Sequence, residues 1–250
     1  MTILDEIVAS TRARLVKEPA IDRAAAKARS PFALTAALRQ NRINVIAEIK
    51  SASPSAGSIV ENPDVESIAA EYKSGGAAAI SIVTEPEFFR GSREWIARVD
   101  GLPVLMKDFI IDESQLIRGI AAGASAILLL ASLLDAAQIR DFIAILDAYQ
   151  CDALVEVHDE AELERAIGGG ARIIGVNNRN LRDFSVDLGA SERLAKQIPD
   201  GVIRVAESGI KTRADVDRLR AAGFDAFLVG ESLLRQNDRA AAVRQLVSGT

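Results

Sequence analysis

Eight short runs rich in Val, Ile, Leu and Ala recur along the chain, and they limit its fold more than any other feature. They occupy residues 45–50, 78–83, 103–107, 126–130, 153–157, 172–177, 202–207 and 226–229. Most are separated by segments of helical period, at 64–74, 113–122, 135–149, 160–167 and 213–222. Strand and helix therefore alternate as in repeated βαβ units, and near-continuous apolar strands predict a parallel sheet that is buried on both faces.

The pattern alone fits a closed barrel and an open doubly wound sheet nearly equally well. A length of 250 residues, of which 49% are hydrophobic, matches the usual size of an eight-fold barrel. Polar residues at many strand ends favour closure, because an open sheet gathers its site at one switch point. The sequence also contains no GxGxxG or Walker motif for a nucleotide. We therefore predict an α/β fold, a (β/α)8 TIM barrel.

We expect one domain, a barrel over residues 1–250 in which residues 1–44 form an N-terminal helical extension. Two segments of this extension, 3–17 and 31–40, look helical and would pack across the barrel. Glycines follow several predicted helices, as at 75–76 and 223, and they end a helix cheaply because they adopt the left-handed conformation.

The balance of charge excludes several classes of partner. The 30 basic and 35 acidic residues give a formal net charge of −5, without the clustered basic excess of a nucleic-acid surface. The first ten residues carry acids and no basic start, and the longest apolar stretch, 124–134, is too short to span a bilayer. We therefore expect a cytoplasmic protein with no nucleic-acid or membrane partner. The one cysteine, Cys151, cannot form an internal disulfide and is expected to be a small buried residue.

Six charged or amide side chains stand at or near the ends of separate apolar runs. They are Glu48, Lys50, Lys107, Glu156, Asn177 and Glu207. Since side chains alternate along a strand, Glu48 and Lys50 share a face with Ile46 and would point into the barrel mouth, and the same parity applies to the other four. An isolated charge of this kind is most simply part of a structural ion pair. Two lysines and three carboxylates at equivalent positions favour an acid–base active site instead.

Turns rich in glycine and serine follow three of the predicted strands. Residues 207–210 come after the seventh strand and 230–232 after the eighth, where barrels often bind phosphate through backbone N–H groups. The loop at 51–57 after the first strand would add further donors. Each is an ordinary turn when taken alone. Together they predict a small-molecule substrate that carries a phosphate.

Seven stretches, in order, resemble the indole-3-glycerol-phosphate synthase family. They are AEIKSASPSAG (47–57), FFRGS (88–92), LMKDFIID (105–112), LVEVHDEAEL (154–163), IGVNNRNL (174–181), AESGI (206–210) and LVGESLL (228–234). The AEIK, SPS, KDFIID and GVNNRNL blocks are highly specific, whereas AESGI also occurs in other phosphate-binding barrels. The sequence departs from the commonest form at Ser51 and Ala56, where many members carry basic residues. This departure would weaken the attraction of an anionic substrate without altering the central chemistry.

The resemblance implies a carboxy-lyase of tryptophan biosynthesis that needs no cofactor or metal. It would close the pyrrole ring of 1-(2-carboxyphenylamino)-1-deoxyribulose 5-phosphate, with loss of carbon dioxide and water, to give indole-3-glycerol phosphate. By the same likeness Lys107 is the general acid and Glu156 the general base. Lys50 binds the substrate carboxylate and assists proton transfer, while Glu48 keeps the lysines oriented and charged.

The resemblance also implies the rest of the site. Asn177 and Ser208 complete the catalytic set. The substrate-binding residues are Ser53, Phe109, Leu128, Arg179, Leu181, Glu207, Gly209, Gly230 and Glu231. Among these, Phe109, Leu128 and Leu181 form an apolar wall. Serine, glycine and the backbone of Glu231 hold the phosphate.

One further residue and two other functions compete with this prediction. His158, the only histidine, is expected to be a loop residue outside the chemistry, because Lys107 and Glu156 already supply acid and base. A phosphoribosyl isomerase such as phosphoribosylanthranilate isomerase needs a different acid–base pair. A non-catalytic barrel that binds a phosphorylated metabolite would tolerate loss of Lys107 or Glu156. We expect a monomer, with a weak homodimer as the alternative.

Overall fold

The computed structural model describes residues 2–21, 23–27, 30–180 and 184–249. Eight parallel strands close into a barrel in the order β1, β4, β5, β6, β7, β8, β9, β10, and β10 pairs with β1. They are β1 (Asn44–Ile49), β4 (Ala79–Val83), β5 (Val104–Lys107), β6 (Ala126–Leu130), β7 (Asp152–Val157), β8 (Ile173–Asn177), β9 (Ile203–Glu207) and β10 (Ala226–Val229). The predicted barrel is confirmed, and each predicted strand lies within one residue of the observed bounds.

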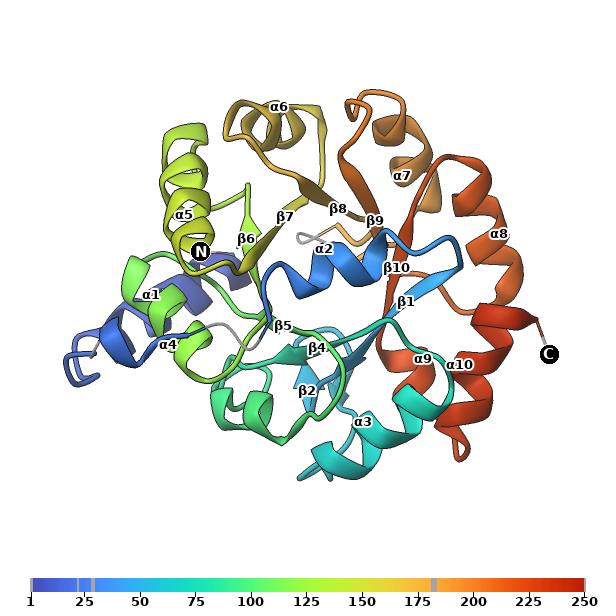
Figure 1. Cartoon of the computed structure of the whole chain (residues 1–250), viewed down its shortest axis with the longest axis horizontal. Coiled ribbons are helices and arrows are strands. Elements are labelled where there is room, and N and C mark those ends of the chain that lie inside the picture. Colours follow the sequence, from blue (N-terminus) through green and yellow to red (C-terminus); the bar gives the residue numbers. More distant parts are fainter. Residues whose placement is uncertain (1, 22, 28–29, 181–183, 250) are drawn as a thin grey trace.

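Helices surround the barrel and connect its strands (Figure 1). They are α3 (Val65–Ser74), α4 (Glu113–Ala121), α5 (Ala136–Ala148), α6 (Glu160–Gly168), α7 (Leu188–Ala195), α8 (Arg213–Ala221), α9 (Glu231–Leu234) and α10 (Arg239–Ser248). Between β4 and β5 the connection is a 3-10 helix, η2 (Arg93–Arg98). Acidic or threonine N-caps begin many of these helices; for example, the Asp159 side chain accepts from the Glu162 N–H at the start of α6. A short hairpin of β2 (Ala52–Ser53) and β3 (Gly57–Ser58) follows β1.

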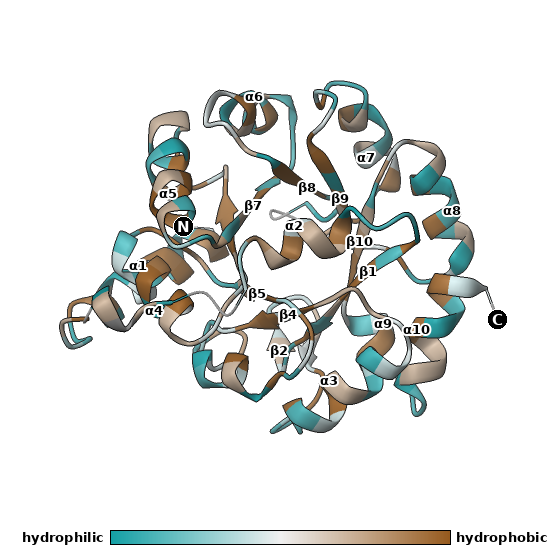
Figure 2. Cartoon of the chain, viewed as in Figure 1, coloured by the Kyte–Doolittle hydropathy of each residue, from teal (hydrophilic) through white to brown (hydrophobic). Residues whose placement is uncertain are grey.

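The alternation of side chains along the strands divides the core into two layers. Val45, Ala47 and Ile49 of β1 belong to the layer between the strands and the helices. Ile46 belongs to the interior of the barrel, where it packs with residues such as Leu105 and Leu154. Figure 2 shows the apolar strands at the centre and polar residues gathered on the outer sides of the helices. The predicted parity is therefore confirmed, and it fixes which strand-end residues enter the mouth.

The N-terminal extension closes the barrel at one end and borders it at the other. Leu34 and Leu38 of α2 (Ala33–Leu38) are buried with the interior residues of the strands. The backbone N–H and the hydroxyl of Thr35 donate to Asp152 at the start of β7, at 3.0 and 2.6 Å. Helix α2 thus lies across the amino ends of the strands (Figure 1). Helix α1 (Ile3–Leu15) contributes instead to the cavity at the carboxyl ends.

Cys151 is fully buried at the entrance to β7, as predicted, and burial raises the pKa of its thiol. Within the described ranges, no helix is long and apolar enough to cross a membrane.

Candidate active site

A cavity of about 950 Å³ opens at the carboxyl ends of the strands. Every predicted site residue that the structure describes lines it: Glu48, Lys50, Ser53, Lys107, Phe109, Leu128, Glu156, Asn177, Arg179, Glu207, Ser208, Gly209, Gly230 and Glu231. Leu181, the remaining one, lies outside the described residues. Residues from seven of the eight strands or the loops after them thus meet in one place, which is where barrels build their sites.

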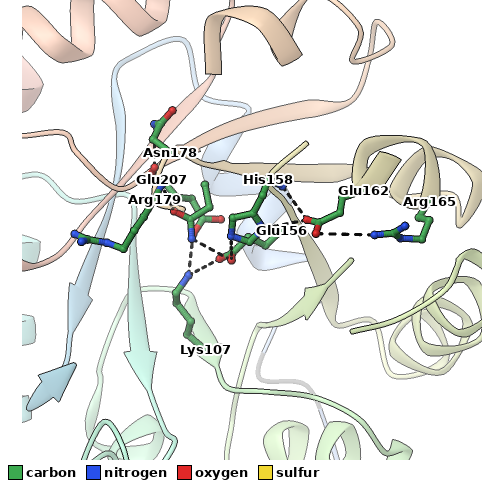
Figure 3. Close-up of polar contacts among 9 residues, drawn as sticks. Lys107, Glu156, His158, Glu162, Arg165, Asn178, Arg179 and Glu207 are labelled. Carbon is green, nitrogen blue, oxygen red and sulfur yellow. Dashed lines mark hydrogen bonds and ion pairs between the residues drawn. The ribbon is translucent and has the colours of Figure 1, made fainter. Parts of the chain in front are cut away.

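Lys107 at the end of β5 lies at the centre of the charged residues. Its ammonium nitrogen Nζ donates to Glu156 Oε2 and to Glu207 Oε2, both at 2.8 Å. Figure 3 shows the Lys107 side chain extended toward these two carboxylates. The carboxylate side chains are 4% and 1% exposed, and that of Lys107 is 20% exposed. The lysine is therefore the member of the trio that remains open to the cavity.

Burial and mutual charge set the protonation of this trio. Burial alone would lower the pKa of Lys107, but the carboxylates of Glu156, Glu207 and Glu48 outweigh it and raise that pKa. Burial would raise the pKa of Glu156, but Lys107, His158 and a hydrogen bond from Asn177 lower it to about 2. Burial, together with the neighbouring Glu156 charge, raises the pKa of Glu207 to about 8 despite Lys107. The trio therefore combines the Lys107 ammonium and the Glu156 carboxylate with Glu207, the carboxyl group of the two that takes up a proton more readily.

A second ion pair lies in the same cavity. Lys50 Nζ is 2.7 Å from Glu48 Oε1, and the Glu48 side chain is only 4% exposed. Although burial acts to raise the pKa of Glu48, the charges of Lys50 and Lys107 lower it. Gly230 is packed so closely on this pair that a Cβ there would lie 2.5 Å from Glu48 Oε1. The glycine is therefore required at this position to leave room for the carboxylate.

Asn177 orders the wall beside Glu156. Its Nδ2 donates to Glu156 Oε1 at 3.1 Å, and its Oδ1 accepts from the Arg179 N–H at 3.0 Å. The Arg179 guanidinium donates in turn to the Phe184 carbonyl at 3.3 Å. These bonds fix the orientation of the asparagine amide, and with it one oxygen of Glu156.

The three loops predicted to bind phosphate are neighbours. β9, β10 and β1 pair in sequence around the barrel, so the loops after them lie side by side at the mouth. Ser208 and Gly209 both have positive φ, at 63° and 81°, which turns the backbone sharply after β9. The carboxylate of Glu231 accepts from Arg235 Nε at 2.9 Å, so it is paired within its own helix. A cradle made of backbone groups is consistent with this arrangement.

An apolar wall faces the charged residues, and part of it was not predicted. Phe109 is stacked at a tilt on Phe89, with the ring centroids 5.8 Å apart, and both line the cavity. Ile3 and Leu4 of α1 also line it. Phe89 falls within the FFRGS stretch, whose resemblance to the family does not by itself assign it to the cavity. The helical period of α1 predicted a helix but carried no signal of where that helix would dock.

His158 follows β7 directly, as expected for a loop residue, but its ring is turned toward the site. Its Nε2 lies 3.5 Å from Glu156 Oε1, and its Nδ1 forms a 3.0 Å hydrogen bond with Glu162 Oε2 (Figure 3). Parity from Glu156 would have placed it on this face, although a residue just beyond a strand need not follow the strand.

Fold and site together define a class of protein: a (β/α)8-barrel enzyme with a cluster of lysines and carboxylates at the carboxyl ends of the strands, acting on a phosphorylated small molecule. The family model for indole-3-glycerol phosphate synthase matches residues 4–246. The chain belongs to this family, whose members are carboxy-lyases of tryptophan biosynthesis. The membership favours the synthase over the isomerase and the binding-protein alternatives.

Relatives named indole-3-glycerol phosphate synthase extend over the whole chain. That of Ruminiclostridium cellulolyticum is 43% identical over 255 residues, covering 98% of each chain. That of Lactiplantibacillus plantarum is 42% identical and covers 99% of this chain and 98% of its own. That of Chlorobium phaeovibrioides is 49% identical over 76% of this chain and 75% of its own.

Solved structures at lower identity support the fold. One titled native KDPGal structure has a TM-score of 0.61 at 16% identity, covering 83% of this chain and 94% of its own. Thiamine phosphate pyrophosphorylase from Pyrococcus furiosus has a TM-score of 0.59 at 19% identity, covering 82% and 94%. At such identities the likeness concerns the barrel alone.

Proposed function

We propose that the cavity closes the pyrrole ring of 1-(2-carboxyphenylamino)-1-deoxyribulose 5-phosphate, with Lys107 as general acid and Glu156 as general base. The observation that carries this assignment is the position of Lys107, which donates to both Glu156 and Glu207 at 2.8 Å and is still exposed to the cavity. A charged donor in that position can meet an oxyanion as it forms.

In the first step, the ring carbon that bears the substrate carboxylate attacks the ribulose carbonyl carbon. The carbonyl oxygen becomes an alkoxide, and Lys107 gives it a proton, so that a hydroxyl results. Lys50, which Glu48 holds at 2.7 Å, binds the substrate carboxylate until it leaves as carbon dioxide. The electron pair of the broken carbon–carbon bond returns to the ring and restores its aromaticity.

In the second step, Glu156 removes a proton from the neighbouring carbon. Lys107 takes up this proton through its 2.8 Å contact with Glu156 and gives it to the hydroxyl, which leaves as water. A carboxylate beside an ammonium is a weak base, because the cation stabilises its charge. Once Lys107 has given its proton to the alkoxide, that stabilisation falls and Glu156 becomes a stronger base. The shared contact thus makes the base effective only after the acid has acted.

The remaining residues bind and orient the substrate. Ser53, Gly209, Gly230 and the backbone of Glu231 hold the phosphate, and Phe109 and Leu128 bear on the anthranilate ring. Asn177, Ser208, Arg179 and Glu207 position the reacting atoms. The burial of Glu207 and its contact with Lys107 suit a residue that orients the acid.

The arrangement of the whole molecule belongs to the same proposal. The chain is one barrel domain over residues 1–250, with residues 1–44 as its helical extension. It works in the cytoplasm as a monomer, without a cofactor. The contacts of α1 with the cavity and of α2 with the strand ends support a single unit.

The test is to mix purified protein with the substrate and, separately, with its dephosphorylated form. Indole fluorescence and released carbon dioxide are followed together. We expect equal amounts of both products from the phosphorylated substrate and a much higher KM without the phosphate. A folded protein that forms neither product would overturn the proposal.

A further inference from the structure

A titratable side chain that lies beside the trio of Lys107, Glu156 and Glu207 has no role in the proposed steps. His158 is the only histidine in the chain, and its side chain is 14% exposed. Glu162, from the first turn of α6, is hydrogen-bonded to the ring nitrogen Nδ1 of His158. Figure 3 shows Glu162, His158 and Glu156 beside one another, with Lys107 below them.

Glu162 clamps the loop that carries the imidazole. Its Oε2 accepts from the His158 backbone N–H at 2.9 Å and also bonds His158 Nδ1 at 3.0 Å. The Glu162 backbone is itself held by Asp159 at 2.9 Å, and its Oε1 lies 3.9 Å from Arg165. Arg165 Nε donates to the Ala131 carbonyl at 2.9 Å, which ties the group to the end of β6. The Nδ1 side of the His158 ring is therefore fixed.

The other ring nitrogen, Nε2, faces Glu156, the proposed general base. His158 Nε2 lies 3.5 Å from Glu156 Oε1, and it is buried without a hydrogen-bond partner among the described residues. A neutral imidazole has one N–H and one lone pair, so in either tautomer a lone pair would face a carboxylate. Only the imidazolium presents an N–H to both Glu162 and Glu156. The geometry therefore favours the charged ring.

The charged groups around the ring agree with this. Glu162 and Arg165 face it from α6, Glu156 from β7 and Glu207 from β9, and Lys107 of β5 is bonded to Glu156. Although burial acts to lower the pKa of His158, the bond with Glu162 and the charges of Glu156, Glu162 and Glu207 raise it.

We propose that His158 is a positioning residue that acts through Glu156: clamped by Glu162, its ring presents an N–H that holds the Glu156 carboxylate when Lys107 has given up its proton. In the resting site Glu156 is held by Lys107 and Asn177, and 3.5 Å is too long for a good hydrogen bond from His158. Once Lys107 loses its charge, Glu156 loses its strongest partner. A small shift toward the imidazolium then keeps it in place. The inference rests on the proposed function of Glu156 as the base.

Because the chain has a single histidine, NMR of the imidazole nitrogens reports on this ring alone in protein freed of any histidine tag. We expect it to titrate above the usual value of about 6.5. Both Glu162→Gln and Glu156→Gln should lower this pKa by about one unit or more. Glu164→Gln makes the same charge change at an exposed position of α6 and should leave it unaltered.

Kinetics separate positioning from a purely structural role. His158→Asn keeps a donor for Glu162 but removes the group that faces Glu156, so kcat should fall about tenfold while KM changes less than twofold. In the parent, kcat should fall as the pH rises through the ring pKa measured by NMR. His158→Gln carries a permanently neutral N–H donor. Its kcat should lie between those of His158→Asn and the parent, and it should not fall as the pH rises through this range.

Two results would overturn the inference: a ring pKa that neither glutamate substitution changes, or a folded His158→Asn variant with parental kcat. The NMR arm needs no substrate. An inactive parent would therefore count against the proposed function alone, whereas an active parent with an unperturbed ring would count against the role of His158 alone.

Discussion

Glu207 lies as close to the Lys107 ammonium as Glu156 does, 2.8 Å in each case, yet the pKa values of the two carboxyl groups shift in opposite directions. Burial and the Glu156 charge raise the pKa of Glu207 from 4.5 to about 8, whereas Lys107 keeps that of Glu156 low. Although Lys107 lowers both pKa values, burial and the Glu156 charge outweigh it at Glu207. The raised pKa of Glu207 makes the stability of the fold depend on pH.

A group whose pKa is raised by folding stabilises the protein fully below its unfolded pKa and loses that contribution as the pH rises through its folded pKa. For Glu207 this window runs from about pH 4.5 to about pH 8. Glu207→Gln is neutral throughout. Its free energy of unfolding in urea, relative to the parent, should therefore increase as the pH rises across this window. A difference that stays constant with pH would show that Glu207 does not take up a proton on folding.

The space beside Glu207 is too small for a side chain larger than that of Gly175. A Cβ on Gly175 of β8 would overlap the Glu207 carboxylate and lie 2.8 Å from Leu154 Cδ2. Gly175→Ala should therefore displace Glu207 from Lys107, lower kcat at least tenfold and destabilise the fold by about 1–3 kcal/mol, as overpacking does. Gly168→Ala is the control, because its Cβ would meet only Ala136 at 3.6 Å. Thermal unfolding and kcat of both variants check this, and parental kcat in Gly175→Ala would contradict it.

Glu85 organises the loop that carries Phe89. Its fully buried carboxylate accepts from the backbone N–H groups of Glu87, Phe88 and Phe89 at 2.7–3.1 Å and from Arg14 of α1 at 3.3 Å. Glu85→Gln should weaken these charge-assisted bonds, lower stability by about 1–3 kcal/mol and raise KM more than it lowers kcat.

The exposed neighbour Glu87 provides the matched control. Glu87→Gln should behave as the parent in urea unfolding and in steady-state kinetics. Equal effects of the two substitutions would mean that net charge in this loop matters, and not the buried carboxylate of Glu85.

Local sequence predicts much of this architecture because strand and helix periods are local properties. The runs that end at Lys107, Glu156 and Glu207 identified strands, and their parity placed these side chains in the mouth. The docking of α1 could not be predicted in this way. Its residues Ile3 and Leu4 contact a cavity formed by segments far along the chain, and helical period does not specify a partner.

His158 and Phe89 illustrate the same limit at the scale of single residues. Parity applies within a strand, and His158 stands just beyond β7, where the backbone turns toward the Asp159 cap. Only the clamp by Glu162, four residues later, aims its ring at Glu156. Phe89 enters the cavity through the bonds that Glu85 makes to its loop. Both depend on side-chain contacts across a turn, which have no regular period.

The most direct test of the central claim is the turnover of Lys107→Met, a variant that keeps most of the side-chain volume but cannot give a proton. Lys211→Met is the control, because Lys211 lines the same cavity from an exposed position. If Lys107 is the general acid, its substitution should lower kcat by about 10²–10⁴-fold in a protein that still binds substrate, while Lys211→Met keeps kcat near that of the parent. A folded Lys107→Met variant with kcat within tenfold of the parent would contradict the account.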